Sequence, residues 1–194
     1  MRSARVLLFV GLFAFAFVPG VAQAQDQPGV RFIVVIGGGQ GSASLRCDGC
    51  LTAKQNEPSG YFRVGRLIRS GLVVGGEIDT WLQTSDDGDQ RFNVSTADAF
   101  GQWYLRRGFF VTGGIGISRI QTEIDIVQQG LPLTVLQSDT GLGFHAGAGY
   151  EFQFAPHTAF IPFATFFGTQ GVEFADTGPF NAYVFVLGIG LSLN

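Results

Sequence analysis

Six ionisable residues stand inside segments that are otherwise rich in Val, Ile, Phe, Tyr and Gly. They are Arg63, Glu77, Asp79, Asp98, His145 and Glu151. Charged groups that are kept from water need partners, so these side chains either form a closed network of ion pairs and hydrogen bonds or line a narrow path for a proton, an ion or a solute. No catalytic set can be assembled, because His145 and the hydroxyls of Ser118 and Ser192 have no supporting motif. We therefore expect no enzyme activity, no cofactor and no metal site.

Cys47 and Cys50 form the only cysteine pair, with Cys-x-x-Cys spacing. In an exported protein, which the N-terminus indicates, such a pair meets an oxidising environment, and a disulfide closing this short loop is the expected state. A redox-active pair and a metal site are the alternatives. The first normally needs a βαβ context that is absent here, and tetrahedral zinc normally takes four ligands, whereas His145 and His157 lie elsewhere in the chain.

The N-terminus has the three parts of a secretory signal peptide. Arg2 and Arg5 supply positive charge, residues 6–18 are all apolar, and an Ala-Gln-Ala sequence at 22–24 supplies a small-residue cleavage site. The apolar stretch is too short to span a bilayer. The expected division is a signal peptide at residues 1–24 and one barrel domain at residues 25–194, which functions outside the cytoplasm.

The composition differs from that of an ordinary soluble domain. Only 14% of the residues are charged, against about 25% in typical soluble domains, while 29 residues are Gly and 20 are Phe. Without Arg2 and Arg5, 10 of the 12 basic residues remain against 15 acidic ones, and this balance is unlike a nucleic-acid-binding surface. No later apolar run approaches the length of a membrane helix. These features favour a membrane β-barrel over a soluble one.

Eight segments have the length and residue types of transmembrane strands, which need about 9–11 residues. They are residues 30–44, 60–69, 72–84, 92–105, 109–122, 141–154, 158–169 and 181–193. Tight turns at 70–71, 106–108 and 155–157 alternate with long connections at 45–59, 85–91, 123–140 and 170–180. This alternation is typical of outer-membrane barrels, which have short periplasmic turns and long external loops. We predict an all-β protein, an eight-stranded antiparallel up-and-down transmembrane β-barrel.

Alternation within the strands separates large apolar residues from Gly. The apolar face of the last and third-last strands comprises Leu142, Phe144, Tyr150, Phe152, Tyr183, Phe185, Leu187, Ile189 and Leu191. The opposite face is mostly Gly with a few polar residues, which suits a narrow interior and could not solubilise an outer wall. We therefore predict that the apolar face contacts lipid and that the six ionisable residues line the lumen. Aromatic residues near strand ends, including Tyr61, Trp81 and Trp103, are candidates for interfacial girdles.

These features together resemble a known family. The signal peptide, the loop alternation, the Gly-rich strand at 111–117 and the amphipathic last strand are similar to those of the small eight-stranded outer-membrane β-barrel proteins of Gram-negative bacteria, the porin-like OmpA-, OmpX- and OmpW-like group. The resemblance covers the mature chain. It implies a place in the outer membrane, contact with lipid and lipopolysaccharide, and folding by the barrel-assembly machinery. The group usually ends in an aromatic residue, whereas this chain ends Leu193-Asn194.

The expected function is that of a membrane scaffold with a side-chain-filled lumen, presenting its long connections to an extracellular partner. The OmpW-like resemblance implies the alternative of a narrow channel or transporter for a small or apolar solute. The apolar residues at 131–136 could gate such a solute, bind a partner or extend a hairpin above the membrane. A secreted soluble barrel that binds an apolar ligand is a third possibility, against which the low charge argues. No nucleic-acid partner is expected.

Overall fold

The computed structural model describes residues 31–46, 55–69, 71–85, 90–106, 108–128, 131–174 and 178–193. The predicted signal peptide and both cysteines, Cys47 and Cys50, lie outside these residues. The strands are β1 (Phe32–Arg46), β2 (Gln55–Arg69), β3 (Leu72–Thr84), β4 (Gln90–Arg106), β5 (Phe109–Gln128), β6 (Leu131–Tyr150), β7 (Phe152–Ala155), β8 (Thr158–Phe174) and β9 (Gly178–Leu193). In this part of the chain no helix has the length and apolarity to cross a bilayer.

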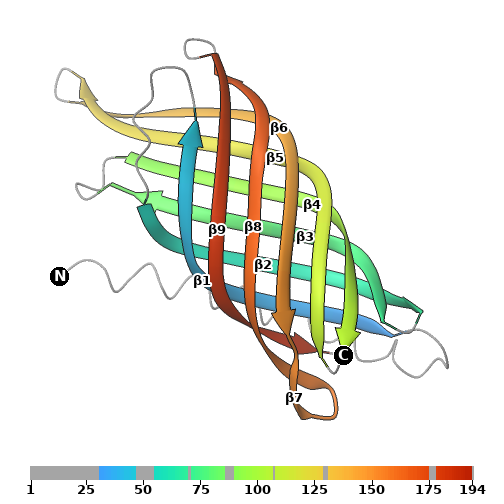
Figure 1. The fold of residues 1–194 in the computed structure, drawn as a ribbon. Coiled ribbons are helices and arrows are strands. Elements are labelled where there is room, and N and C mark those ends of the chain that lie inside the picture. The colour runs from blue at the N-terminus through green and yellow to red at the C-terminus, as the bar shows by residue number, and fades with distance from the viewer. Residues whose placement is uncertain are drawn as a thin grey trace, which may run out of the picture.

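The strands form one antiparallel sheet that closes on itself (Figure 1). Sequence neighbours pair along the sheet, β1 also pairs with β9, and pairing of β6 with β8 completes the circle. Strands β6 and β7 follow one another along a single barrel strand, so the barrel has eight strands. The predicted fold is therefore confirmed. Within the closed part of the barrel each strand has a partner on both sides, as hydrocarbon requires of any sheet that crosses it.

The predicted strand at 141–154 is interrupted between β6 and β7. Gly149 pairs with Phe163 and Phe152 pairs with Phe160, so the register is the same on both sides of the break. In that register Tyr150 lies opposite Pro162. A proline has no N–H to donate to the ladder, and this accounts for the local loss of pairing.

The three short turns stand where the sequence predicts them. Gly71 and Gly108 have φ values of 84° and 90°, which L-residues with a Cβ rarely adopt. The carbonyl oxygens of these glycines also accept hydrogen bonds from the next strand along the barrel, from the N–H of Tyr104 at 2.8 Å and of Glu151 at 2.9 Å. These two turns are thereby bonded to the adjacent part of the barrel, at Tyr104 and at Glu151.

The long connections are shorter than predicted, because the strands continue further at that end. The largest difference is at 123–140, where β5 and β6 pair without a break up to Gln128 opposite Leu131. The backbone ladder does not need apolar side chains once a strand has left the membrane, so the end of the apolar pattern marks the edge of the apolar belt rather than the end of the strand.

The interior is filled by three layers of side chains. A loop-end layer, next to the long connections, contains Ala43, Trp81, Val94, Ile120, Phe167, Val172, Phe180, Ala182, Val184 and Val186. A turn-end layer contains Ile33, Val35, Tyr61, Val73, Phe100, Phe110 and Ile161. A polar middle layer lies between them. The expectation of an interior made mostly of Gly and polar residues is therefore too simple, and Tyr61 and Trp81 point inward rather than belonging to an interfacial girdle.

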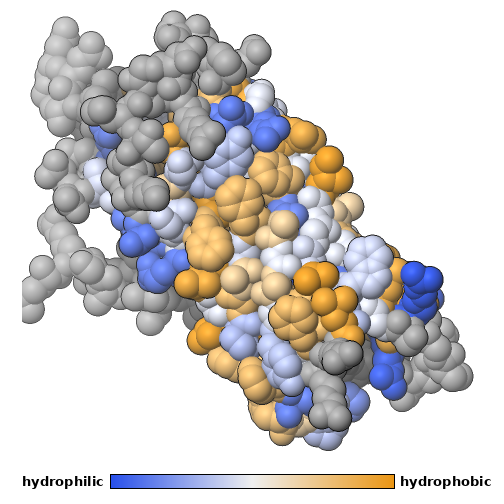
Figure 2. All heavy atoms as spheres, viewed as in Figure 1, coloured by the Kyte–Doolittle hydropathy of each residue, from blue (hydrophilic) through white to orange (hydrophobic). Residues whose placement is uncertain are grey.

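The outer surface is apolar around its middle. Leu142, Phe152, Phe185, Leu187, Ile189 and Leu191 are exposed there, as are the β5 residues Ile115 and Ile117. Phe144 and Tyr183 are half-buried because they pack against Phe166 on the same surface, with ring centroids about 6 Å apart. Tyr150 is half-buried against Phe152. Figure 2 shows apolar residues over the middle of the face in view and hydrophilic residues toward its ends.

Candidate functional site

The ionisable residues of the polar middle layer come from four strands. Arg63 lies on β2, Glu77 and Asp79 on β3, Asp98 on β4 and His145 on β6, and each is at most 5% exposed. Arg63 pairs with Glu77 across β2 and β3, and Glu77 pairs with Asp98 across β3 and β4. One guanidinium and two carboxylates therefore stand in a row across three neighbouring strands. Two like charges directly opposite each other destabilise a sheet unless something else compensates them.

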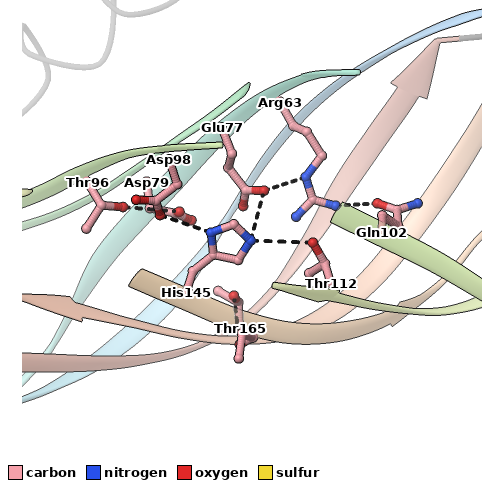
Figure 3. A network of polar contacts seen from close by, with 10 residues as sticks. Arg63, Glu77, Asp79, Thr96, Asp98, Gln102, Thr112, His145 and Thr165 are labelled. Atoms are coloured by element: carbon pink, nitrogen blue, oxygen red, sulfur yellow. Dashed lines mark hydrogen bonds and ion pairs between the residues drawn. The ribbon is translucent and has the colours of Figure 1, made fainter. Parts of the chain in front are cut away.

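Arg63 compensates Glu77. The Arg63 Nε donates to Glu77 Oε2 at 2.6 Å, and Nη1 donates to the Gln102 side-chain oxygen at 2.5 Å (Figure 3). The guanidinium also lies over the rings of Phe100 and Tyr61, at 4.8 and 5.4 Å from their centroids. These rings belong to the turn-end layer, so Arg63 joins that layer to the polar one through both charge and cation–π contacts.

His145 joins the carboxylates from the other side. Its Nδ1 lies 3.0 Å from Asp98 Oδ2, and its Nε2 lies 3.5 Å from Glu77 Oε2 and 3.4 Å from Thr112 Oγ1. Asp79 completes the group by accepting a hydrogen bond from Thr96 Oγ1 at 3.4 Å. In Figure 3 these side chains converge on the imidazole from different strands.

Glycines make the room that these side chains occupy. A Cβ at Gly114 on β5 would lie 2.5 Å from His145 Cε1, which is closer than any real contact allows. A Cβ at Gly143 would lie 3.1 Å from Asp98 Oδ1 and 2.8 Å from the Ile117 backbone. Part of the unusual glycine content therefore serves the polar layer, because it lets large charged side chains cross a narrow lumen.

The cluster carries more negative than positive charge. Three carboxylates face one guanidinium, which leaves a net charge of −2 with a neutral imidazole and −1 with a protonated one. Among the described residues, Glu77 Oε1 and Asp98 Oδ1 have no hydrogen-bond partner. One ligand atom from each of Glu77, Asp79 and His145 lies within 4.8 Å of the others, so these residues have the donor types and proximity to hold a metal ion.

Five of the six predicted lumenal residues come together, and Glu151 does not. Glu151 is half-buried at the break between β6 and β7, where it accepts a hydrogen bond from Tyr104 Oη at 2.6 Å. Thr96, Gln102 and Thr112 belong to the polar layer but were not predicted. On β4 a signal was available, because Thr96 and Gln102 stand at even intervals from Asp98 and so share its face.

Little space remains around the cluster. A cavity of about 10 Å³ lies beside Arg63 and Glu77 and is closed by Tyr61, Phe110 and Phe163. This volume is room for about one water molecule. The arrangement is suited to holding charge in place, and the cavity that the described residues form beside it has no room for a substrate of ordinary size.

Comparisons with known proteins agree on the architecture. The sequence profile of the outer membrane protein beta-barrel domain matches residues 7–191. Among solved structures, Ail, the attachment invasion locus protein of Yersinia pestis, is 14% identical with a TM-score of 0.61, and the match covers 84% of this chain and 99% of Ail. Neisserial surface protein A is 15% identical with a TM-score of 0.55, over 85% of this chain and 98% of that one. No curated protein sequence matches the chain.

Proposed function

Because the chain belongs to the outer membrane protein beta-barrel domain family, we propose that it is a closed scaffold in the bacterial outer membrane, whose non-catalytic function is carried by its extracellular end. The outer-membrane location and the barrel itself follow from the family. The choice of a scaffold over a channel, and the assignment of function to one end, are the proposal.

The observation that carries the proposal is the filling of the lumen. Apolar layers lie toward both ends of the described barrel, and Trp81, Phe167 and Ile120 in the loop-end layer are all fully buried. A hydrated solute that entered would have to displace these side chains, each of which contributes roughly 1.5–3 kcal/mol by being buried. A narrow channel or transporter is therefore the less favoured reading.

The extension of β5 and β6 supports a role in interaction. Strand β4 pairs with β5 only as far as Gln90 opposite Ile124, so beyond Ile124 the two strands form a free ribbon. Val135 and Leu136 are neighbours on β6 at the base of this ribbon, where β6 pairs with β5 alone among the described strands, and they are 42% and 58% exposed. Contiguous exposed apolar residues outside a membrane are typical of contact surfaces for other molecules. We assign the proposed extracellular partner to this ribbon.

The outer surface below the ribbon is suited to lipopolysaccharide. Along β5 the outward residues change from Ile115 and Ile117 to Arg119, whose guanidinium donates to Ser138 Oγ at 3.1 Å. Arginine at the border of an apolar belt can pair with headgroup phosphates. Delivery by the barrel-assembly machinery is part of the same proposal. Ail was solved with a heparin analogue bound, and a sulfated polysaccharide is therefore a ligand class to include when partners are tested.

Conductance across a planar lipid bilayer tests the scaffold reading. We expect the folded wild-type barrel to give no steps above the bare membrane. A double variant, Trp81→Ala with Phe167→Ala, removes the two largest fully buried side chains of the loop-end layer and provides a matched barrel with a less filled lumen. Regular single-channel steps from the wild type, at the same level as those from the double variant, would overturn the scaffold proposal.

A further inference from the structure

The middle of the lumen combines the donor atoms of a metal site with an electrostatic need for one. We propose that Glu77, Asp79 and His145 bind a single divalent transition-metal ion of the Zn²⁺ type, and that Asp98 positions the imidazole for it. The ligand atoms come from two strands on opposite sides of the lumen and lie within 4.8 Å of one another. Side chains on different strands of a closed barrel are held far more rigidly than those of a surface acidic patch.

An unpartnered carboxylate oxygen is the second observation. Glu77 is 2% exposed, and its Oε2 accepts from Arg63 at 2.6 Å, while its Oε1 has no hydrogen-bond partner among the described residues. Leaving a buried charged oxygen without a partner is costly. A cation bound at Oε1 would satisfy this atom and leave the ion pair with Arg63 in place.

The setting of His145 is that of a metal ligand. Its Nδ1 lies 3.0 Å from Asp98 Oδ2, so in the neutral tautomer Nδ1–H donates to this carboxylate. Nε2, whose lone pair is then available, lies 3.5 Å from Glu77 Oε2 and 3.4 Å from Thr112 Oγ1, so a bound metal would replace the hydrogen bond from the Thr112 hydroxyl. Histidines that bind metals almost always donate their other ring N–H to a carboxylate or carbonyl in this way, which fixes the ring and makes it a better ligand.

A divalent ion would balance the charge of the cluster. With neutral His145 and all three carboxylates ionised, the carboxylates and Arg63 sum to −2, and a single M²⁺ ion brings the buried cluster to zero. Buried charges in a medium of low dielectric are stable only when they are compensated. Two protons would supply the same charge, so metal and protons compete for the cluster.

The donor set selects the class of metal. Ca²⁺ takes six to eight oxygen ligands and Mg²⁺ demands six in a near-ideal octahedron, and neither matches one imidazole with two carboxylates. Zn²⁺ accepts this mixture at about 2.0–2.2 Å in a tetrahedron, which places its ligand atoms about 3.3–3.6 Å from one another. Ligand atoms that lie up to 4.8 Å apart therefore need to close by about 1 Å, through changes in side-chain torsion angles.

The metal content of the folded barrel tests the proposal. The protein used is the full-length chain without a histidine tag, carrying Cys47→Ser and Cys50→Ser so that no thiolate competes for the metal. It is exported in cells grown with added ZnCl2 and is then extracted in detergent. Surface ions are removed with EDTA, and all first-row metals are measured by mass spectrometry. We expect about one ion per folded chain, as for a structural site. A folded barrel of this Cys47→Ser, Cys50→Ser chain that contains no metal would overturn the proposal.

Matched variants assign the site. His145→Gln and Glu77→Gln should lower the metal content at least tenfold, whereas His157→Gln and Glu151→Gln, which change the same residue types outside the cluster, should leave it unchanged. Retention of metal by His145→Gln would overturn the proposal. If His145→Gln does not fold, the His157→Gln barrel loaded with Co²⁺ is used instead, because His145 is then the only histidine of the chain. A paramagnetically shifted imidazole N–H resonance would support binding of the metal by His145. An unshifted resonance would overturn the proposal.

Discussion

At the scale of single residues, Gly114 links the glycine content to the charged interior. Gly114→Ala places a methyl group 2.5 Å from His145 Cε1 and 2.7 Å from the Ala99 carbonyl, so the imidazole or the backbone must move. We expect the free energy of unfolding to fall by about 1–3 kcal/mol, as for other overpacked cores. Urea denaturation in detergent micelles, followed by tryptophan fluorescence, measures this change.

The neighbouring glycine is the control for this prediction. A Cβ at Gly113 meets nothing closer than the His145 carbonyl oxygen at 3.6 Å, an ordinary contact. Gly113→Ala should therefore change stability much less than Gly114→Ala. Equal losses in the two variants would show that glycine acts there through the strand backbone and not through the room it leaves for His145.

The alternation of side chains between the two faces of a strand predicts more of the interior than residue type does. Trp81 stands at even intervals from Glu77 and Asp79, which places it on the same inward face, yet its position near a strand end suggests an interfacial girdle. In the structure Trp81 points inward, as this alternation predicts, and its Nε1 donates to the Gly41 carbonyl at 2.9 Å inside the barrel. The contacts within the polar layer could not be predicted, because they depend on how eight strands are staggered around the barrel.

At the scale of elements, the β5–β6 ribbon should be separable from the barrel. Replacing residues 125–134 by Asn-Gly joins Ile124 to Val135, which already pair, through a two-residue turn that suits an antiparallel hairpin. We expect a folded barrel whose free energy of unfolding changes by no more than about 0.5 kcal/mol, since among the described strands the backbone of this segment pairs only within the hairpin. Heat-dependent gel mobility and urea denaturation measure folding and stability.

A deeper excision provides the contrast. Replacing residues 119–140 by Asn-Gly joins Ser118 to Gly141, which also pair, but removes Ile120 from the loop-end layer, where it is fully buried. This variant should lose about 2–5 kcal/mol, as for other large core deletions. If the shorter excision is as damaging as the longer one, the ribbon is part of the folding unit.

Strand positions and short turns were predictable because each rests on local signals. Alternation marks the strands, and Gly71 and Gly108 mark two of the tight turns. The long connections were overestimated because polar residues at 123–140 carry no apolar alternation, although their backbones pair. The break at Tyr150 depends on Pro162 in another strand, and only the register between the two strands reveals it.

At the scale of the whole molecule, the two tryptophans report which side of the wall faces the membrane. Trp81 is 0% exposed inside the barrel, and Trp103 is 51% exposed on its outer surface. In bilayers with brominated acyl chains, the Trp81→Phe variant, which keeps Trp103, should be strongly quenched, and the Trp103→Phe variant should be quenched little. Strong quenching of Trp81 would contradict the inward orientation of β3.

The architecture as a whole was predictable from composition and loop alternation, because a closed barrel is the only sheet that satisfies its backbone in lipid. The family match agrees with this reading. The layered interior was not predictable, since an apolar residue satisfies either a lipid-facing or a lumen-facing position. Phe166 and Phe167 are adjacent in sequence, yet Phe167 lies inside the barrel and Phe166 on its outer surface. Only the closure of the sheet decides which of the two faces the lumen.

The apolar layers on both sides of the charged cluster also affect how fast protons and ions in the cluster exchange with the surrounding solution. Exchange between the cluster and the surrounding solution requires the buried side chains of these layers to move aside, and such opening is a rare event in a stable core. Whatever protons or ions are enclosed as the barrel closes are then retained far longer than equilibrium with the medium would suggest. Two preparations with the same sequence and the same buffer can therefore differ in their interiors, and the difference records the conditions under which each was folded.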